Sequence, residues 1–164
     1  MAIARSLQSY LEHREVDFDI VEHPHSHTAL ETAHAAHVPE HQVAKAVVLE
    51  DDDGYVVAVV PSTNRLDFGW VRDTLGRDMH LATEAALAPL FRDCELGAVP
   101  AFSDAYGLDV IWDDQLDGNS DIYIEAGDHE HLVRVSGDQF SQLMSGMPHS
   151  LISAESDYSN WASG

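Results

Sequence analysis

Apolar positions recur along this chain with the two spacings that distinguish helices from strands. Between Ile3 and Leu11 they return every three or four residues, which predicts an amphipathic helix over residues 3–14. From Val16 to Ile20 apolar residues alternate with acids, as in a half-buried strand. Further helices are predicted near 66–75 and 83–91, and further strands at 108–112, 122–126 and 132–135.

Two short motifs predict where other helices begin. Thr28-Ala-Leu-Glu31 and Ser136-Gly-Asp-Gln139 are capping boxes, in which side chains satisfy free backbone N–H groups of a first helical turn. The first of these helices should stop before Pro39, because proline lacks the N–H that would continue it. The second should run to about Met144.

The arrangement of strands predicts the fold class. Apolar runs at 45–49 and 55–60 flank an acidic turn that ends in Gly54, which predicts a β-hairpin. A tight hairpin among mixed helices and strands argues against strict βαβ repetition. We therefore predict an α+β fold with a mixed sheet, one domain over residues 1–146, and a loose Ser- and Gly-rich tail over 147–164.

The charge of the chain is strongly one-sided. Twenty-nine Asp and Glu residues oppose eight Lys and Arg, for a formal net charge of −21. The acids are spread along the whole chain, which favours adaptation to high salt over a single positively charged partner. Lys45 is the only lysine, and is therefore a candidate for a role that arginine cannot fill.

Several classes of protein are excluded or disfavoured by composition. No apolar run approaches the roughly 20 residues of a membrane span, and residues 1–15 lack the apolar stretch of a secretory signal. One cysteine, Cys94, allows no internal disulfide and fits a reducing cytoplasm, where we expect it to be a buried structural thiol. No G-x-G-x-x-G or Walker loop is present, so we expect no nucleotide cofactor.

Eleven histidines raise the question of a metal site. His23, His25 and His27 alternate, and alternate residues of a strand point to one side. Pro24, however, breaks regular strand geometry, and no H-E-x-x-H motif or paired cysteine accompanies the group. We expect no metal site and no cofactor, and keep a metal-binding histidine protein as a less favoured alternative.

Five short motifs stand out between about residues 15 and 145. They are His23-Pro-His-Ser-His-Thr-Ala29, Gln42-Val-Ala-Lys45, Gly97-Ala-Val-Pro100, Val110-Ile-Trp-Asp113 and Ala126-Gly-Asp-His129. In this order and spacing, the chain resembles the editing domains of the YbaK and prolyl-tRNA synthetase family. The resemblance implies a curled mixed sheet flanked by helices, and hydrolysis of the ester that joins a wrong amino acid to the tRNA 3′ end.

The resemblance also implies roles for individual residues. Lys45 would hold the terminal adenosine or its phosphate, and Gly97 would present backbone amides to the ester carbonyl. His129 would help define the amino-acid pocket, and Asp113 is the expected family acid near it. The other substrate-binding residues implied are Ala98, Val99 and Pro100 in the loop, and His23, Ser26 and Thr28 at the mouth. No protein nucleophile is evident, so we expect water to attack.

One departure from the family pattern concerns the loop after Gly97. The family loop commonly reads G-x-x-x-P, whereas this chain has Pro100 followed by Ala101. Such pockets discriminate by volume, and one methylene is worth only about 1–3 kcal/mol. The sequence therefore predicts a small amino acid, and leaves open whether it is alanine, cysteine, serine or another.

The expected partner is the acceptor end of misacylated tRNA, with an aminoacyl-tRNA synthetase as a second candidate. We expect neither a membrane nor DNA as a partner. The main alternative to a trans-editing deacylase is a catalytically silent module of the same fold that binds tRNA ends or a synthetase.

Overall fold

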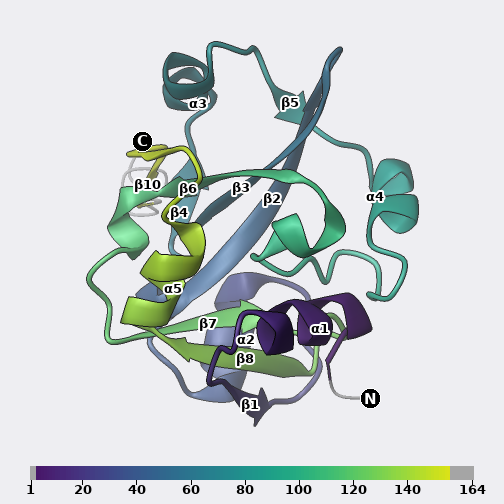
Figure 1. Ribbon diagram of the computed structural model, residues 1–164, viewed down its shortest axis with the longest axis vertical. Helices are drawn as coiled ribbons and strands as arrows, with labels where there is room; N and C mark the ends of the chain where they lie inside the picture. The colour runs from purple at the N-terminus through teal and green to yellow at the C-terminus, as the bar shows by residue number, and fades with distance from the viewer. Residues whose placement is uncertain (1–2, 156–164) are drawn as a thin grey trace, which may run out of the picture.

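The computed structural model describes residues 3–155, which form a single α+β domain, as the sequence predicts (Figure 1). Its α-helices are α1 (Arg5–His13), α2 (Ala29–Ala36), α3 (Phe68–Leu75), α4 (Glu84–Leu90) and α5 (Gly137–Met144). Its strands are β1 (Asp19–Glu22), β2 (Val43–Asp51), β3 (Gly54–Pro61), β4 (Asn64–Leu66), β5 (His80–Leu81), β6 (Asp109–Asp113), β7 (Asp121–Glu125), β8 (His131–Ser136), β9 (His149–Ser150) and β10 (Ser153–Glu155). No helix within these residues is long and apolar enough to cross a membrane.

The main sheet is mixed, with the order β1-β8-β7-β2-β3-β6-β9, and β5 pairs with β2 beside this path. β2 and β3 form the predicted antiparallel hairpin, whereas β7 and β6 pair with them in parallel. Figure 1 shows the hairpin running from the β7–β8 end of the molecule to the α3 end. Within the described residues, β7 pairs with β2 at Val43 and Ala44, and β5 pairs with β2 at Leu49 and Glu50. Between these contacts no strand of residues 3–155 pairs with that edge of β2.

The helices begin where the caps predict. Thr28 Oγ1 accepts the Glu31 N–H (3.1 Å) at the start of α2, and Ser136 Oγ accepts the Gln139 N–H (3.2 Å) at the start of α5. α2 ends at Ala36, before Pro39 as predicted, and the left-handed conformation of the following residue, His37 (φ 58°), terminates it. Local hydrogen bonding therefore sets these boundaries.

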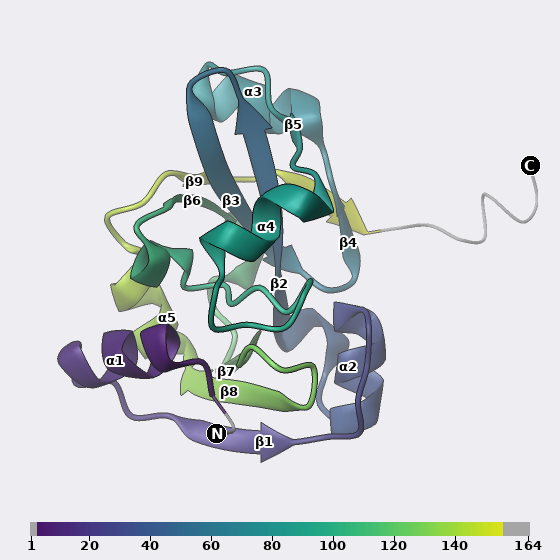
Figure 2. The same cartoon turned by 90° about the vertical axis from the view of Figure 1, so that its right-hand side faces the viewer.

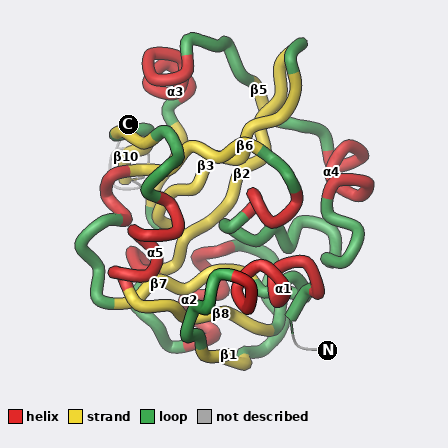
Figure 3. Tube along the Cα trace, viewed as in Figure 1, coloured by secondary structure: helices red, strands yellow, loops and turns green. Residues whose placement is uncertain are grey.

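The core lies on both faces of the β2–β3 hairpin, which explains the unbroken apolar run at 55–60. Val57 and Val59 belong to a larger cluster that includes side chains of α1 and α5. Val56, Ala58 and Val60 belong to a smaller cluster that includes a side chain of α3. Figure 3 shows the helices around the periphery of the strands, and Figures 1 and 2 place α4 beside the hairpin.

The segment from 149 to 155 is paired and packed, in contrast to the loose tail predicted from residue 147. β9 pairs in parallel with β6, and β10 pairs antiparallel with β4. Ile152 is fully buried in the smaller cluster, and its N–H donates to Asp113 Oδ2 (3.0 Å). Serine and glycine content misled the prediction, because one apolar side chain and one distant carboxylate hold the segment. The rest of the predicted tail, 156–164, lies outside the described residues.

Half of the cationic side chains are already engaged with acids of the same chain. Arg14, Arg72, Arg77 and Arg134 form ion pairs within residues 3–155. The hydrogen-bonded Arg77 lowers the pKa of Asp51 to about 2, although burial of the carboxyl opposes this shift. The net charge of −21 is what remains after all eight cations are counted against the 29 acids, so repulsion among the acids is expected.

We expect the thermal midpoint to rise by roughly 5 °C between about 0.05 and 1 M KCl, which corresponds to about 1–2 kcal/mol for a chain of this size. Salt shortens the Debye length to about 3 Å at 1 M and so screens the repulsion among the acids. The exposed ion pairs lose little, because each contributes only about 0–1 kcal/mol. Circular dichroism melts across a KCl series measure the effect, with sucrose as a non-ionic control. A flat or falling midpoint would show that the ion pairs outweigh the repulsion.

Candidate active site

A small cavity of about 270 Å³, here called the inner cavity, opens at the unpaired edge of β2. Its described lining consists of His27, Thr28, Ala29, Thr32, Val43, Ala44, Lys45, Ala46, Gly97, Val99, Glu125, His129 and Leu132. Five of these were predicted as site residues: Thr28, Lys45, Gly97, Val99 and His129. The volume falls just below the roughly 300–1,000 Å³ of pockets for drug-sized ligands, so the inner cavity suits a small group.

Lys45 lies between the inner cavity and a larger neighbouring hollow of about 650 Å³, here called the outer cavity, and lines both. Its backbone pairs with Val60 of β3, and its half-buried side chain makes no ion pair with a carboxylate of residues 3–155. Burial lowers the pKa of Lys45 below its ordinary value, and the charge of nearby Arg65 lowers it further. A partly desolvated ammonium without a counter-ion is well suited to receive an anion such as phosphate.

The loop after α4 carries Gly97 past the inner cavity. Gly97 has a φ of +81°, in the left-handed region that favours glycine. The Ala98 N–H donates to the Glu95 carbonyl (3.0 Å), whereas the Gly97 N–H has no hydrogen-bond partner within the described chain. Of these two adjacent amides, only that of Gly97 is free to bind a substrate oxygen.

Glu125, at the end of β7, organises the turn that carries His129. Its Oε2 accepts the N–H groups of Gly127 (2.9 Å) and His129 (3.3 Å). His129 has a left-handed backbone (φ 63°), and its ring Nε2 lies 2.7 Å from the Leu96 carbonyl oxygen. A carbonyl can only accept, so Nε2 carries the proton and donates it. The turn and the Gly97 loop are thereby held together.

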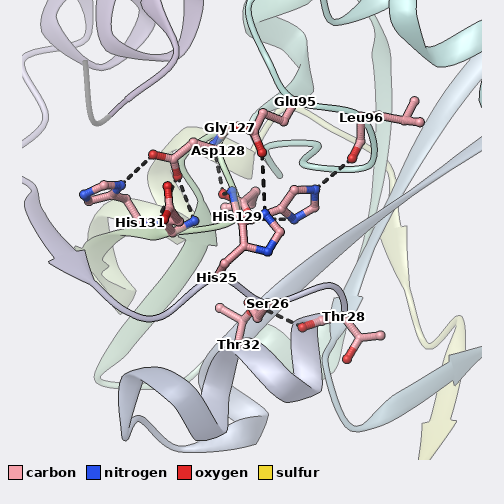
Figure 4. A network of polar contacts seen from close by, with 12 residues as sticks. His25, Ser26, Thr28, Thr32, Glu95, Leu96, Gly127, Asp128, His129 and His131 are labelled. Carbon is pink, nitrogen blue, oxygen red and sulfur yellow. Dashed lines mark hydrogen bonds and ion pairs between the residues drawn. The ribbon is translucent and has the colours of Figure 1, made fainter.

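Segment 23–28 supports the wall of the inner cavity from behind. The Ser26 N–H donates to the His129 carbonyl (3.1 Å), and the hydroxyls of Ser26 and Thr32 lie 2.6 Å apart (Figure 4). His23 and Ser26 are buried and line neither cavity, whereas Thr28 lines both. Two of the three residues predicted at the mouth therefore brace the site.

Three further predicted residues lie outside both cavities. Ala98 and Pro100 belong to the loop after Gly97 but are buried. The Pro100 carbonyl accepts a hydrogen bond from the Ser103 hydroxyl (2.7 Å). Asp113 is fully buried and binds the segment that contains Ile152. The acid beside the pocket is Glu125, and Asp113 lies elsewhere.

Two histidines of the first motif, His25 and His27, lie close to His129, and His27 lines the inner cavity. The ring centroids of His25 and His27 are 5.1 Å apart, and those of His25 and His129 are 5.4 Å apart. Residues 3–155 nevertheless contain no group of three or more His, Cys, Asp or Glu side chains that could hold a metal ion. His34, His37 and His41 line a different hollow of about 830 Å³, which contains none of the predicted site residues.

Cys94 is a poor candidate nucleophile, in agreement with the predicted structural role. Its half-buried thiol lies 3.2 Å from the Tyr106 hydroxyl, and burial raises its pKa to about 12. The thiolate is the reactive form of cysteine, so this environment suppresses it.

A family model described as the aminoacyl-tRNA editing domain matches residues 23–143. The chain belongs to this family. The match confirms the resemblance predicted from the five motifs and covers all of the residues that line the inner cavity. No curated protein matches this chain significantly.

Solved structures share the architecture of this editing domain. One, described as "a putative trans-editing enzyme for prolyl tRNA synthetase", is 26% identical with a TM-score of 0.78, over 92% of this chain and 96% of that chain. A structure from a study of epitope backbone grafting by computational design is also 26% identical, with a TM-score of 0.79 over 93% and 97% of the two chains. The hypothetical protein APE2540 is 18% identical with a TM-score of 0.80, over 92% and 100%, and shows the fold alone.

Sequence reasoning missed Glu125, His27 and Thr32 of the editing domain's inner cavity. Glu125 is one of 29 acids and stands at the end of an ordinary alternating strand. Its proximity to Gly127 and His129 in the last motif was the available signal. This proximity indicates a site residue only when the structure shows that the carboxylate accepts hydrogen bonds from the backbone N–H groups of Gly127 and His129.

Proposed function

We propose that this editing domain acts in trans as a deacylase that hydrolyses the ester between a small, wrong amino acid and the 3′ end of tRNA. The observation that carries the proposal is the convergence of Lys45, Gly97 and His129 on one cavity of about 270 Å³. The aminoacyl group occupies the inner cavity and the terminal adenosine the outer cavity. Lys45 lies between them, against a phosphate or the adenosine.

Water is the nucleophile in this proposal. The described lining of the inner cavity contains no cysteine or serine. Its two threonine hydroxyls serve the backbone, since Thr28 Oγ1 accepts the Glu31 N–H and Thr32 Oγ1 donates to the Thr28 carbonyl. A hydroxyl of the substrate ribose directs the water, and the Gly97 N–H stabilises the oxygen on which negative charge develops.

Recognition rests on the acceptor end of the tRNA. Lys45 and Arg65 line the outer cavity, whereas four of the remaining six cationic side chains pair with acids. A chain of charge −21 gains little from long-range attraction to a polyanion. A synthetase partner would supply the basic surface for the rest of the tRNA.

The direct test is a deacylation assay with tRNAs that carry alanine, serine, cysteine, glycine and larger amino acids, in EDTA and without ATP. We expect at least one tRNA with a small residue to be hydrolysed well above the buffer rate. If every tRNA decays at the buffer rate yet still binds, the protein is a silent tRNA-end module. Activity that requires added metal would remove the metal-independent part of the proposal.

We expect Gly97→Ala to lower kcat by about tenfold or more, with a smaller change in KM. Alanine is disfavoured at a φ of +81°, so the loop must change its backbone conformation and the free amide is displaced from the ester. Gly76→Ala is the matched control, because Gly76 also has a positive φ (+69°) but ends α3, where an added methyl would meet nothing within 4 Å. Equal kcat in both variants would remove Gly97 from the chemistry.

A further inference from the structure

The inner cavity contains one carboxylate in its described lining, and that carboxylate has an unused oxygen. Glu125 Oε2 is engaged by the N–H groups of Gly127 and His129. Glu125 Oε1 makes no hydrogen bond within residues 3–155 and lies 3.7 Å from His129 Nδ1. The side chain lines the cavity and is only 16% exposed, so bulk water has little access to it.

The second atom of this pair is also an acceptor. Because His129 Nε2 donates to the Leu96 carbonyl, Nδ1 of the neutral ring carries a lone pair. Two acceptors 3.7 Å apart are too distant to bond to each other, and neither has a donor of its own within the described chain. A single donor group placed between them would satisfy both, and a cationic donor would also neutralise the partly buried carboxylate.

We infer that Glu125 Oε1 and His129 Nδ1 together bind the α-ammonium group of the aminoacyl ester, an inference that rests on the proposed function. Every aminoacyl-tRNA carries this ammonium one carbon from the scissile ester. Gly97 also lines this cavity, and a methyl group added there would lie 3.8 Å from the His129 ring, so the Gly97 loop lies beside the proposed anchor. In this pose the ammonium lies against Glu125, the ester against Gly97 and the phosphate against Lys45.

This arrangement assigns Glu125 a role in specificity that a purely steric pocket would lack. Val43, Ala44, Val99 and Leu132 supply apolar walls for the side chain of the amino acid. Binding of the ammonium fixes the position of the α-carbon, so that the size of the amino-acid side chain determines whether it fits between these walls. Esters without a free α-ammonium lose the anchor and bind in variable poses.

The test uses two non-hydrolysable probes, 3′-amino-3′-deoxyadenosine acylated through an amide with L-alanine or with propionic acid, which differ only in the ammonium. We expect calorimetry with the wild-type protein at pH 7 to show about tenfold or more preference for the alanyl probe. The preference should fall as pH rises to about 9.5, because an α-amino group loses its proton near pH 7.7–8.0.

Glu125→Gln should reduce the preference to within about twofold and leave binding of the propionyl probe unchanged, since the glutamine carbonyl still accepts the two backbone N–H groups. Glu95→Gln is the control: it removes the same charge from an exposed side chain that faces His25 at 3.7 Å and lies outside the lining, and it should keep the full preference. A merely structural role for Glu125 would alter binding of both probes equally.

The outcomes separate this inference from the proposed function. A preference that survives in Glu125→Gln, or wild-type protein that binds the two probes equally or not at all, overturns the role of Glu125 even if misacylated tRNA is hydrolysed. A Glu125-dependent preference in a protein that hydrolyses no aminoacyl-tRNA supports the anchor and overturns only the deacylase.

Discussion

Lys45→Ala is expected to lower kcat/KM for deacylation by at least about 100-fold, equivalent to about 2.7 kcal/mol of transition-state stabilisation. Lys45 lines both cavities and is the group best placed to hold the nucleotide while the ester lies beside Gly97. Lys45→Arg should restore little, because a guanidinium is larger and would crowd Arg65, whose charge already acts on this site. Deacylation kinetics under single-turnover conditions provide the measurement.

The fold of Lys45→Ala should be intact, within about 1 kcal/mol of the wild-type stability. The burial that lowers the pKa of Lys45 shows that the folded state disfavours its charge, so loss of the ammonium removes an unfavourable contribution at neutral pH. Arg5→Ala is the control for the loss of one positive charge, because Arg5 is exposed and lies outside the family match. Comparable loss of activity in both variants would point to general electrostatics and away from a specific contact.

Asp113→Asn is expected to lower the free energy of unfolding by about 3 kcal/mol or more, and the thermal midpoint by roughly 6–12 °C. Asp113 is fully buried, and its carboxylate accepts four hydrogen bonds. Oδ1 accepts the N–H (2.7 Å) and Nε2 (3.0 Å) of Gln115, and Oδ2 accepts the Ile152 N–H (3.0 Å) and the Ser153 hydroxyl (2.6 Å). The side-chain amide of an asparagine here would turn its NH₂ group toward the donors that now bind one of the two carboxylate oxygens. Those buried donors would then lack an acceptor.

Asp109→Asn provides the matched comparison on the same strand, because Asp109 is exposed and accepts no side-chain hydrogen bond within residues 3–155. Its midpoint should stay within about 2 °C of the wild type, since surface changes are usually worth less than about 0.5 kcal/mol. Urea and thermal denaturation of both variants decide the matter. A small effect at Asp113, together with a large loss of deacylation, would return this residue to the active site, as the sequence first predicted.

The sequence by itself determined the features whose causes lie within a few residues of one another. Thr28 and Ser136 cap their helices through N–H groups three positions ahead, and the turn before Gly54 joins two apolar runs into a hairpin. The motif resemblance placed Lys45, Gly97 and His129 in one site, and the structure brings all three to one cavity. The capped helices and the hairpin can be predicted in this way because propensity and local hydrogen bonding specify them, whereas the shared site of Lys45, Gly97 and His129 was predicted only through the family resemblance.

Only the tertiary structure decided the role of acids that resemble one another in the sequence. Asp113 and Glu125 end the strands β6 and β7 in a chain with 29 acids, and the sequence predicted a role at the pocket for Asp113 and none for Glu125. Asp113 bonds to Ile152, 39 residues away, and so closes the C-terminal segment that composition predicted to be loose. Glu125 turns back onto Gly127 and His129 and keeps one oxygen at the inner cavity. Tertiary packing determines which distant backbone groups lie beside a carboxylate. Where the carboxylate is buried, its role depends on those groups, because an unpaired charge away from water is costly.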